Sequence, residues 1–189
     1  MDKVDQYKNA KFSSTAKLMH WGFVVLFVYG LLKQIDSLNQ LEDSNLLKFE
    51  VVFASVFLFL LLIRFVYMKT TQQSSLPEST PKPQIMAAKI VHSSMYTCLA
   101  LIPFTGLLIG LLFWLGLKDG WLINLVVGAH ELSVSIIYWL IGLHVLAAVY
   151  HRLKNDGVWS SMVPIWKENI KQNLKTSDKI SWKEVIEYY

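Results

Sequence analysis

Cysteine is almost absent from this sequence of 189 residues, in which Cys98 is the only one. A single cysteine excludes an intramolecular disulfide, a CxxC metal or redox pair, and the CxxCH motif that attaches c-type haem. Charged residues are also scarce at 17%, whereas 53% of the residues are hydrophobic. With a mean hydropathy of +0.38, this composition is unlike that of a soluble domain and typical of a membrane protein.

Four segments contain almost no Asp, Glu, Lys or Arg: Leu18–Leu32, Val51–Ile63 with its continuation past Arg64 to Met68, Ile90–Leu117, and Leu132–Tyr150. A helix needs about 20 residues to span a bilayer. The third and fourth segments meet this length, and the long side chains of Lys17, Lys33 and Arg64 can extend the first two to the interface. None of the four alternates with period two, which excludes strands of a barrel. The sequence therefore predicts an all-α integral membrane protein with a bundle of four transmembrane helices.

The connections between these segments are polar. Residues 36–48 form a short loop, residues 70–84 hold three prolines, and residues 118–121 form a turn. The first apolar segment has no small-residue cleavage site after it, so we expect it to remain as an uncleaved anchor. We expect three regions: an N-terminal segment 1–17, a transmembrane domain 18–153 and an amphipathic tail 154–189.

Lysine and arginine are distributed unevenly between the two sides of the predicted membrane. Only Lys33, Lys48 and Lys118 lie on one side, and the other fifteen lie on the side of the two termini. Cytoplasmic loops carry the excess of positive charge in membrane proteins. We therefore expect both termini to lie in the cytoplasm. The net charge of +4 reflects this topology, and no nucleic-acid partner is expected.

All five histidines lie in or beside the apolar segments: His20, His92, His130, His144 and His151. An ionisable residue in the hydrocarbon region is costly and suggests a function, although a hydrogen bond between helices could explain any one of them. His130 and His144 are 14 residues apart, which places them within about 40° on one helix face and about 21 Å apart in depth. His151 follows seven residues later on the same face.

His20 and His144 lie at similar depths from the cytoplasmic side, at about 7–8 Å and about 10 Å. They could bind one haem iron between them, and two imidazoles leave no open position, which favours electron transfer over oxygen binding. His92 has a similar depth and is a rival ligand, a partner for a haem propionate, or a packing residue. Gly106 and Gly110 form a GxxxG pair, which we interpret as ordinary helix packing.

The chain from about His20 to Pro164 resembles the prokaryotic cytochrome b561 family. The similarity is carried by His20–Trp21, Arg64, His92 eleven residues before Pro103, His130–Glu131, and IGLH ending at His144 with His151 seven residues later. It implies a four-helix bundle with two b haems, each bound by two histidines. It also implies that His20 and His144 bind the cytoplasmic haem, that His130 is one ligand of the outer haem, and that His151 lies near a quinone.

One position departs from the family pattern. Glu50, 14 residues before Arg64, stands where the family has the second histidine of the outer haem. Three outcomes are open: no outer haem, a haem on His130 alone, or weak ligation by Glu50 or Lys48. A neutral carboxylic acid is a poor ligand, so we expect fewer than two bis-histidine haems and one as the commonest case. The alternative for His130 is a hydrogen bond to Glu50.

The leading functional interpretation is a membrane b-type cytochrome that exchanges electrons with quinone, with superoxide oxidation as its enzymatic version. The predicted outer loops carry more acidic than basic residues, which argues against capture of an anion there. A second interpretation is a haem-bearing anchor subunit that passes electrons to a soluble dehydrogenase or hydrogenase, docked at the cytoplasmic or outer face. A third is a haem-free four-helix transporter or scaffold, against which the lack of an intramembrane carboxylate ladder counts.

Overall fold

The computed structural model describes residues 12–35, 37–72, 74–77 and 80–168, and these residues form helices and short connections. The long helices are α2 (Ser14–Leu32), α3 (Ser44–Thr71), α4 (Lys82–Trp114) and α5 (Trp121–Lys154). A short 3-10 helix, η1 (Leu38–Glu42), precedes α3, and α6 (Val158–Met162) follows α5. No strand occurs in the described part of the chain, so the predicted all-α class is confirmed. Residues 169–189, most of the predicted tail, lie outside the described residues, as do residues 1–11.

The four long helices are each long and apolar enough to cross a membrane, which makes the chain a multi-pass membrane protein. The helices are longer than the uncharged runs that predicted them. The largest difference is in α5, which begins at Trp121 rather than near Leu132. The apolar stretch after Trp121 extends the helix because the single charge of Glu131 does not interrupt it. His130 therefore lies nine residues inside α5, at about 13 Å from its start.

Local sequence signals fix where these helices begin and end. Ser13 accepts a hydrogen bond from the backbone N–H of Ala16 at the start of α2, and Asp43 does the same for Asn45 at the start of α3. Such caps satisfy N–H groups that have no partner inside the helix. Gly116 and Gly120, with φ of +77° and +104°, form the turn between α4 and α5, where a side chain would strain the backbone.

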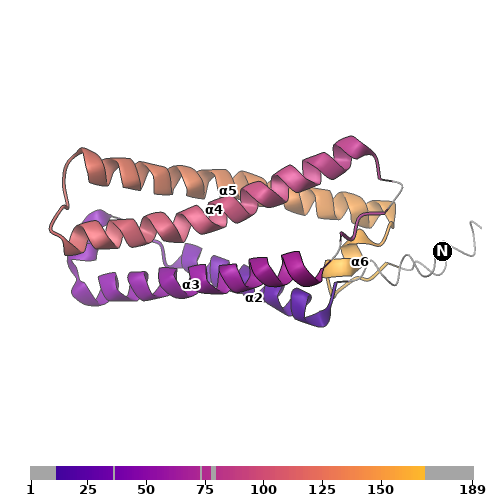
Figure 1. The fold of residues 1–189 in the computed structure, drawn as a ribbon, viewed down its shortest axis with the longest axis horizontal. Coiled ribbons are helices and arrows are strands. Elements are labelled where there is room, and N and C mark those ends of the chain that lie inside the picture. Colours follow the sequence, from indigo (N-terminus) through magenta and orange to yellow (C-terminus); the bar gives the residue numbers. More distant parts are fainter. Residues whose placement is uncertain (1–11, 36, 73, 78–79, 169–189) are drawn as a thin grey trace, which may run out of the picture. The chain divides into compact units, whose positions relative to one another are not determined.

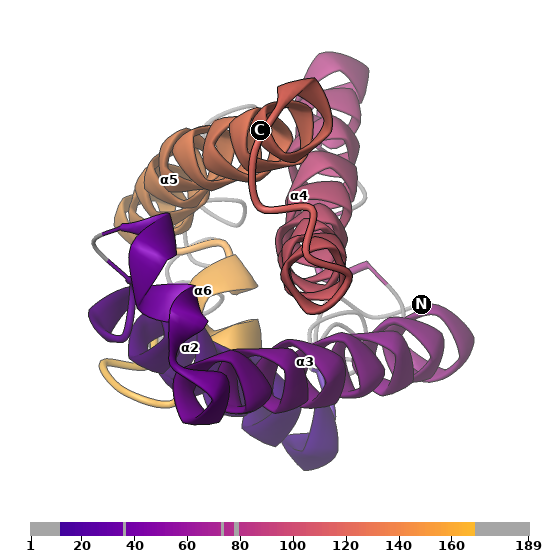
Figure 2. The ribbon, with the colours of Figure 1, turned by 90° about the vertical axis from the view of Figure 1, so that its left-hand side faces the viewer.

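The described chain divides into two compact units. The bundle unit comprises Ser13–Gln72 and Pro81–His144, and so contains α2, η1, α3, α4 and most of α5. The boundary unit includes residues 145–168, which hold the end of α5 and α6. Within the bundle unit, successive helices run in alternating directions, and α4 lies between α3 and α5 (Figures 1 and 2). The start of α2 is joined to the end of α3 by a hydrogen bond of 2.9 Å between the hydroxyls of Ser13 and Tyr67.

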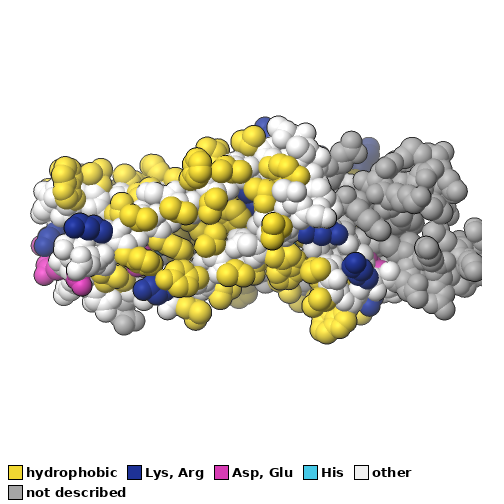
Figure 3. Space-filling view, turned by 90° about the horizontal axis from the view of Figure 1, so that it is seen from below, with side chains coloured by type: hydrophobic (Ala, Val, Ile, Leu, Met, Phe, Trp, Pro, Cys, Tyr) yellow, Lys and Arg dark blue, Asp and Glu magenta, His cyan; other side chains and the backbone are white. Residues whose placement is uncertain are grey.

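The core of the bundle unit lies near η1, at what we call the η1 end. Its buried members come from η1, α4 and α5: Leu41, Ile109, Leu112, Phe113 and Ile123. Large hydrophobic side chains elsewhere point outward; Val25 is 68% exposed and Phe59 is 63% exposed. Figure 3 shows such side chains in yellow over much of the face in view, with acidic residues at the left-hand end. An outer surface of this kind is suited to lipid rather than water.

Candidate functional site

Three histidines from three helices meet at the end of the bundle unit opposite η1. The ring of His144 on α5 lies 6.4 Å from the ring of His20 on α2 and 5.3 Å from that of His92 on α4, measured between centroids. Two imidazoles that bind one metal ion from opposite sides, with N–metal distances of about 2 Å, place their centroids about 6 Å apart. The spacing of His20 and His144 therefore fits a bis-histidine site. His92 packs edge-on against His144, so His144 is the common neighbour of the other two.

Arg64 on α3 is the polar partner of His20. One guanidinium nitrogen lies 3.3 Å from Nδ1 of His20, and another donates a hydrogen bond of 3.0 Å to the Tyr96 hydroxyl. The guanidinium also lies over the rings of Tyr96 and Phe23, at 5.3 and 5.6 Å from their centroids, which is favourable for a cation. The sequence pattern singled out Arg64 as a helix-end residue and a family marker, and it gave no sign of Tyr96.

The Arg64 contact has a consequence for ligation by His20. Because a guanidinium can only donate, Nδ1 of His20 must accept, and the ring proton then resides on Nε2. A metal ion bound at Nε2 requires the proton on Nδ1 instead. Haem binding by His20 through Nε2 therefore requires Arg64 to release Nδ1, while its hydrogen bond to Tyr96 can keep the positive charge nearby.

His130 on α5 is oriented by Thr105 on α4. Nδ1 of His130 lies 2.9 Å from the Thr105 hydroxyl oxygen, which is itself 2.7 Å from the Leu101 carbonyl and 3.0 Å from that of Ile102. The hydroxyl proton of Thr105 is donated to these carbonyls, so the hydroxyl oxygen accepts the N–H of His130 Nδ1. This leaves the lone pair on Nε2. Histidines that bind metals usually donate the other ring N–H in this way.

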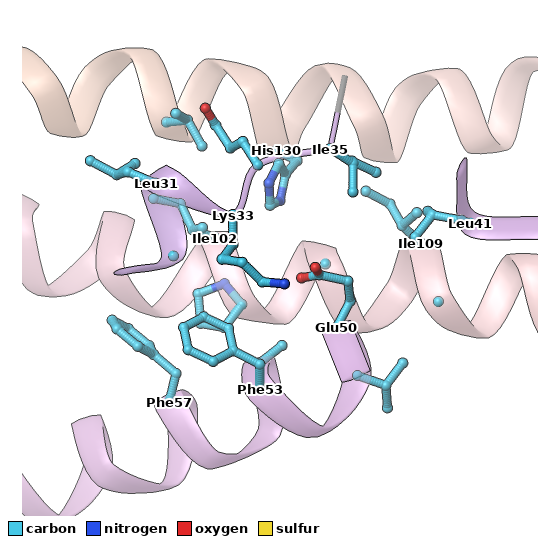
Figure 4. A pocket seen from close by; sticks show the side chains of 18 of the residues that line it. Leu31, Lys33, Ile35, Leu41, Glu50, Phe53, Phe57, Ile102, Ile109 and His130 are labelled. Atoms are coloured by element: carbon cyan, nitrogen blue, oxygen red, sulfur yellow. The ribbon is translucent and has the colours of Figure 1, made fainter. Parts of the chain in front are cut away.

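A cavity of about 410 Å³ lies beside His130 in the bundle unit. This volume is within the range of small-molecule and cofactor pockets, roughly 300–1,000 Å³. Its walls come from the four long helices and the η1 segment, and most of its lining is apolar. Figure 4 shows the ring of His130 pointing into the cavity, with Lys33 and Glu50 extending into it. The cavity lies where the family resemblance predicts the outer haem.

Glu50 is the unusual residue of this cavity. Its Oε1 atom is buried and has no hydrogen-bond partner, so the expected alternative of a hydrogen bond between His130 and Glu50 is not found; His130 bonds Thr105 instead. The amino group of Lys33 and the carboxylate of Glu50 point toward one another in Figure 4. Lys48, the other ligand considered from the sequence, is exposed and does not line the cavity.

The glycines of the GxxxG pair have different surroundings. A Cβ atom on Gly110 would lie 2.7 Å from Cγ2 of Val51, so Gly110 allows α3 and α4 to pack closely. A Cβ atom on Gly106 would lie 3.8 Å from Cε1 of His130. Gly110 thus has the predicted packing role, and Gly106 lines the cavity beside His130. On the side of His130 the cavity offers an imidazole that could hold a haem, and on the other side it presents a carboxylate in place of a second imidazole.

The boundary unit holds His151 in a buried hydrogen bond to Asp156. Nδ1 of His151 donates to Oδ2 of Asp156 at 2.7 Å, and the two side chains are 7% and 9% exposed. Asp156 also accepts from the backbone N–H of Val158 at 3.3 Å, and its carboxylate lies 3.6 Å from Nζ of Lys154. Glu168 fixes the same turn, because it accepts from the backbone N–H groups of Gly157 and Ser160. His151 is therefore anchored rather than free to reach along the interface, and the sequence did not reveal Asp156 as its partner.

Four spanning helices with histidines that face one another between them define the class of membrane-embedded haem proteins. A family model described as prokaryotic cytochrome b561 matches residues 11–164. The chain belongs to the prokaryotic cytochrome b561 family, and it is a b-type cytochrome that carries electrons in a membrane. No curated protein and no solved structure matches the chain.

Proposed function

We propose that this cytochrome exchanges electrons with quinone through a bis-histidine haem held by His20 and His144. The observation that carries the proposal is the 6.4 Å separation of these two rings, which suits two ligands on one iron. The haem, when bound, supplies one-electron redox chemistry. His20 and His144 would hold the haem from both sides, an arrangement that favours electron transfer. The positive charge of Arg64 beside His20 favours the reduced form.

We further propose that the haem-bearing domain spans residues 18–153 in a bacterial inner membrane, with both termini in the cytoplasm. The asymmetry of lysine and arginine along the sequence supports this orientation. The last turn of α5 carries His151, Arg152 and Lys154, a basic end that suits the cytoplasmic boundary. In this orientation the η1 end, with Lys33, Lys48 and Lys118, faces outward.

His151 is the residue that we propose for proton exchange with quinone. Reduction of a quinone to a quinol takes two electrons, one from each of two reduced cytochrome molecules, and two protons. Histidine exchanges protons in the physiological pH range, and we propose that His151 transfers one of the two while water supplies the other. The carboxylate of Asp156 keeps the Nδ1–H of His151 in place, so the ring gives up and regains its proton at Nε2.

The charges at the η1 end favour this quinone-centred role over superoxide oxidation. Lys118 is paired with Glu42 at 3.3 Å, and Asp43 and Glu131 add negative charge to the same half of the bundle unit. An anionic donor is attracted by positive potential, which this end does not offer.

The experiment is stopped-flow reoxidation of the dithionite-reduced, purified protein by a short-chain ubiquinone analogue. We expect the quinone to reoxidise the haem, and we expect His151→Ala to slow the reaction by about 10²-fold at unchanged haem content. Tyr150→Phe is the matched control, because it changes the neighbouring ring and should leave the rate unchanged. A haem that quinone does not reoxidise, or an unchanged rate in His151→Ala, contradicts the proposal. A superoxide source added to the oxidised protein should produce little reduction.

A further inference from the structure

We infer that the cavity at the η1 end is a site for a small exogenous haem ligand, built on a haem that His130 alone binds and flanked by Glu50 and Lys33. The inference rests on the proposed function in one respect, since it also takes the chain to bind haem. It differs from the family pattern, in which two histidines close both axial positions, and it follows from three features of the cavity.

The first feature is the protonation state of His130. Thr105 donates its hydroxyl proton to the Leu101 and Ile102 carbonyls and accepts the N–H of His130 Nδ1. The Nε2 lone pair is then available to a metal ion. His20, by contrast, accepts a hydrogen bond at Nδ1 from Arg64. In the absence of haem, His130 thus already has the tautomer that a ligand needs, with the outer-shell partner that holds it in place.

The second feature is the absence of another strong haem ligand. Histidine, cysteine, methionine and tyrosine are the usual axial ligands of haem in proteins. Among the described residues that line the cavity, His130 is the only one of these four types. The ammonium of Lys33 has no lone pair to offer, and a carboxylate is a poor partner for haem iron beside an imidazole. The protein therefore supplies one good axial ligand and leaves the other position for a small molecule.

The third feature is the polar pair opposite His130. Glu50 Oε1 is buried without a hydrogen-bond partner, and the Lys33 amino group points toward it (Figure 4). The surrounding side chains are apolar, among them Phe53, Phe57 and Ile102. A buried oxygen without a partner costs free energy that a donor on a ligand could recover. Together Glu50 and Lys33 can accept from and donate to a diatomic or peroxide-sized ligand.

Carbon monoxide is the probe, because it binds reduced haem only where an axial position is open. The purified full-length protein is reduced, its haem is counted by the pyridine haemochrome assay, and the CO difference spectrum is recorded. We expect about half of the haem to react with CO, since two imidazoles close the other site. We expect His130→Ala to lose the CO-reactive half and keep the low-spin half. Glu50→His should keep the total haem, become fully low-spin and lose CO binding.

Two further variants keep the test decisive if Glu50→His folds poorly. Glu50→Gln retains the shape of the side chain without supplying an imidazole, so CO binding should persist with an altered affinity. Glu42→Gln, an exposed carboxylate of η1 that does not line the cavity, should change neither haem content nor CO binding. Two low-spin centres in the parent protein by electron paramagnetic resonance, or CO binding that survives His130→Ala, would overturn the inference. A protein with one low-spin haem and no CO binding would overturn this inference but leave the proposed function standing. A protein without haem would overturn both the inference and the proposed function.

Discussion

Arg64 should set the midpoint potential of the haem that we assign to His20 and His144. Its guanidinium nitrogen lies 3.3 Å from Nδ1 of His20 and is also held by Tyr96. A fixed positive charge stabilises the reduced haem, which carries one positive charge less than the oxidised haem. Replacement of Arg64 by glutamine removes the charge and keeps a hydrogen-bond donor, so we expect the potential to fall.

The size of the fall follows from the distance between the charges. The width of an imidazole ring and an N–iron distance of about 2 Å, added to the 3.3 Å contact, give a guanidinium–iron distance of about 7 Å. Arg64 must release Nδ1 when haem binds, but its hydrogen bond to Tyr96 keeps the charge near this distance. At an effective dielectric constant of about 20, one unit charge at this distance contributes about 2.4 kcal/mol. For a one-electron couple this corresponds to roughly 100 mV.

The assay is a spectroscopic redox titration of the purified Arg64→Gln variant beside the parent protein. Tyr96→Phe is the control, because it removes a neutral hydrogen bond and keeps the charge, and its potential should shift much less. A potential in Arg64→Gln that stays within about 20 mV of the parent, well below the Coulomb expectation, would refute the assignment of the haem to His20. A rise in potential would refute the sign of the argument.

Two other substitutions test the cavity and the packing around it. Thr105→Val removes the acceptor of the His130 N–H and should weaken haem binding at His130 by about 10–100-fold in a haem titration of the apoprotein. The control is Ser133→Ala, which loses only a bond to the Ala129 carbonyl. Equal haem affinities in the two variants would contradict the role of Thr105. Gly110→Ala places a Cβ atom 2.7 Å from Val51 and should destabilise the bundle by about 1–3 kcal/mol in thermal unfolding of the detergent-solubilised protein. Gly106→Ala should leave the stability almost unchanged. A Gly106→Ala variant less stable than Gly110→Ala would contradict the close packing of α3 and α4 at Gly110.

The sequence was sufficient for the features that depend on periodicity along one helix. The uncharged runs predicted four spanning helices, because a bilayer admits few other structures. Equal depth on two helices also predicted that His20 and His144 would meet, and their rings do lie together. The start of α5 was placed too late, since the prediction stopped at the one charge of Glu131 although the helix continues to Trp121.

The features that depend on contacts between helices could not be read from the sequence. Thr105 is 25 residues from His130, and a threonine inside an apolar helix ordinarily bonds its own backbone. Asp156 lies beyond the end of α5 and reaches His151 only because the chain turns back at Gly157, whose φ is +90°. Glu50 was recognised as a departure from the family pattern, yet only the cavity shows that its oxygen lacks a partner.

The most direct test of the central claim is the reduced-minus-oxidised spectrum of His20→Ala and His144→Ala, with haem counted per polypeptide. The account predicts that either substitution abolishes the low-spin bis-histidine spectrum, because each ring is one of two axial ligands. His92→Ala is the control, since His92 only packs against His144, and it should keep that spectrum. A full-intensity six-coordinate spectrum in His20→Ala or His144→Ala, or its loss in His92→Ala alone, would contradict the assignment.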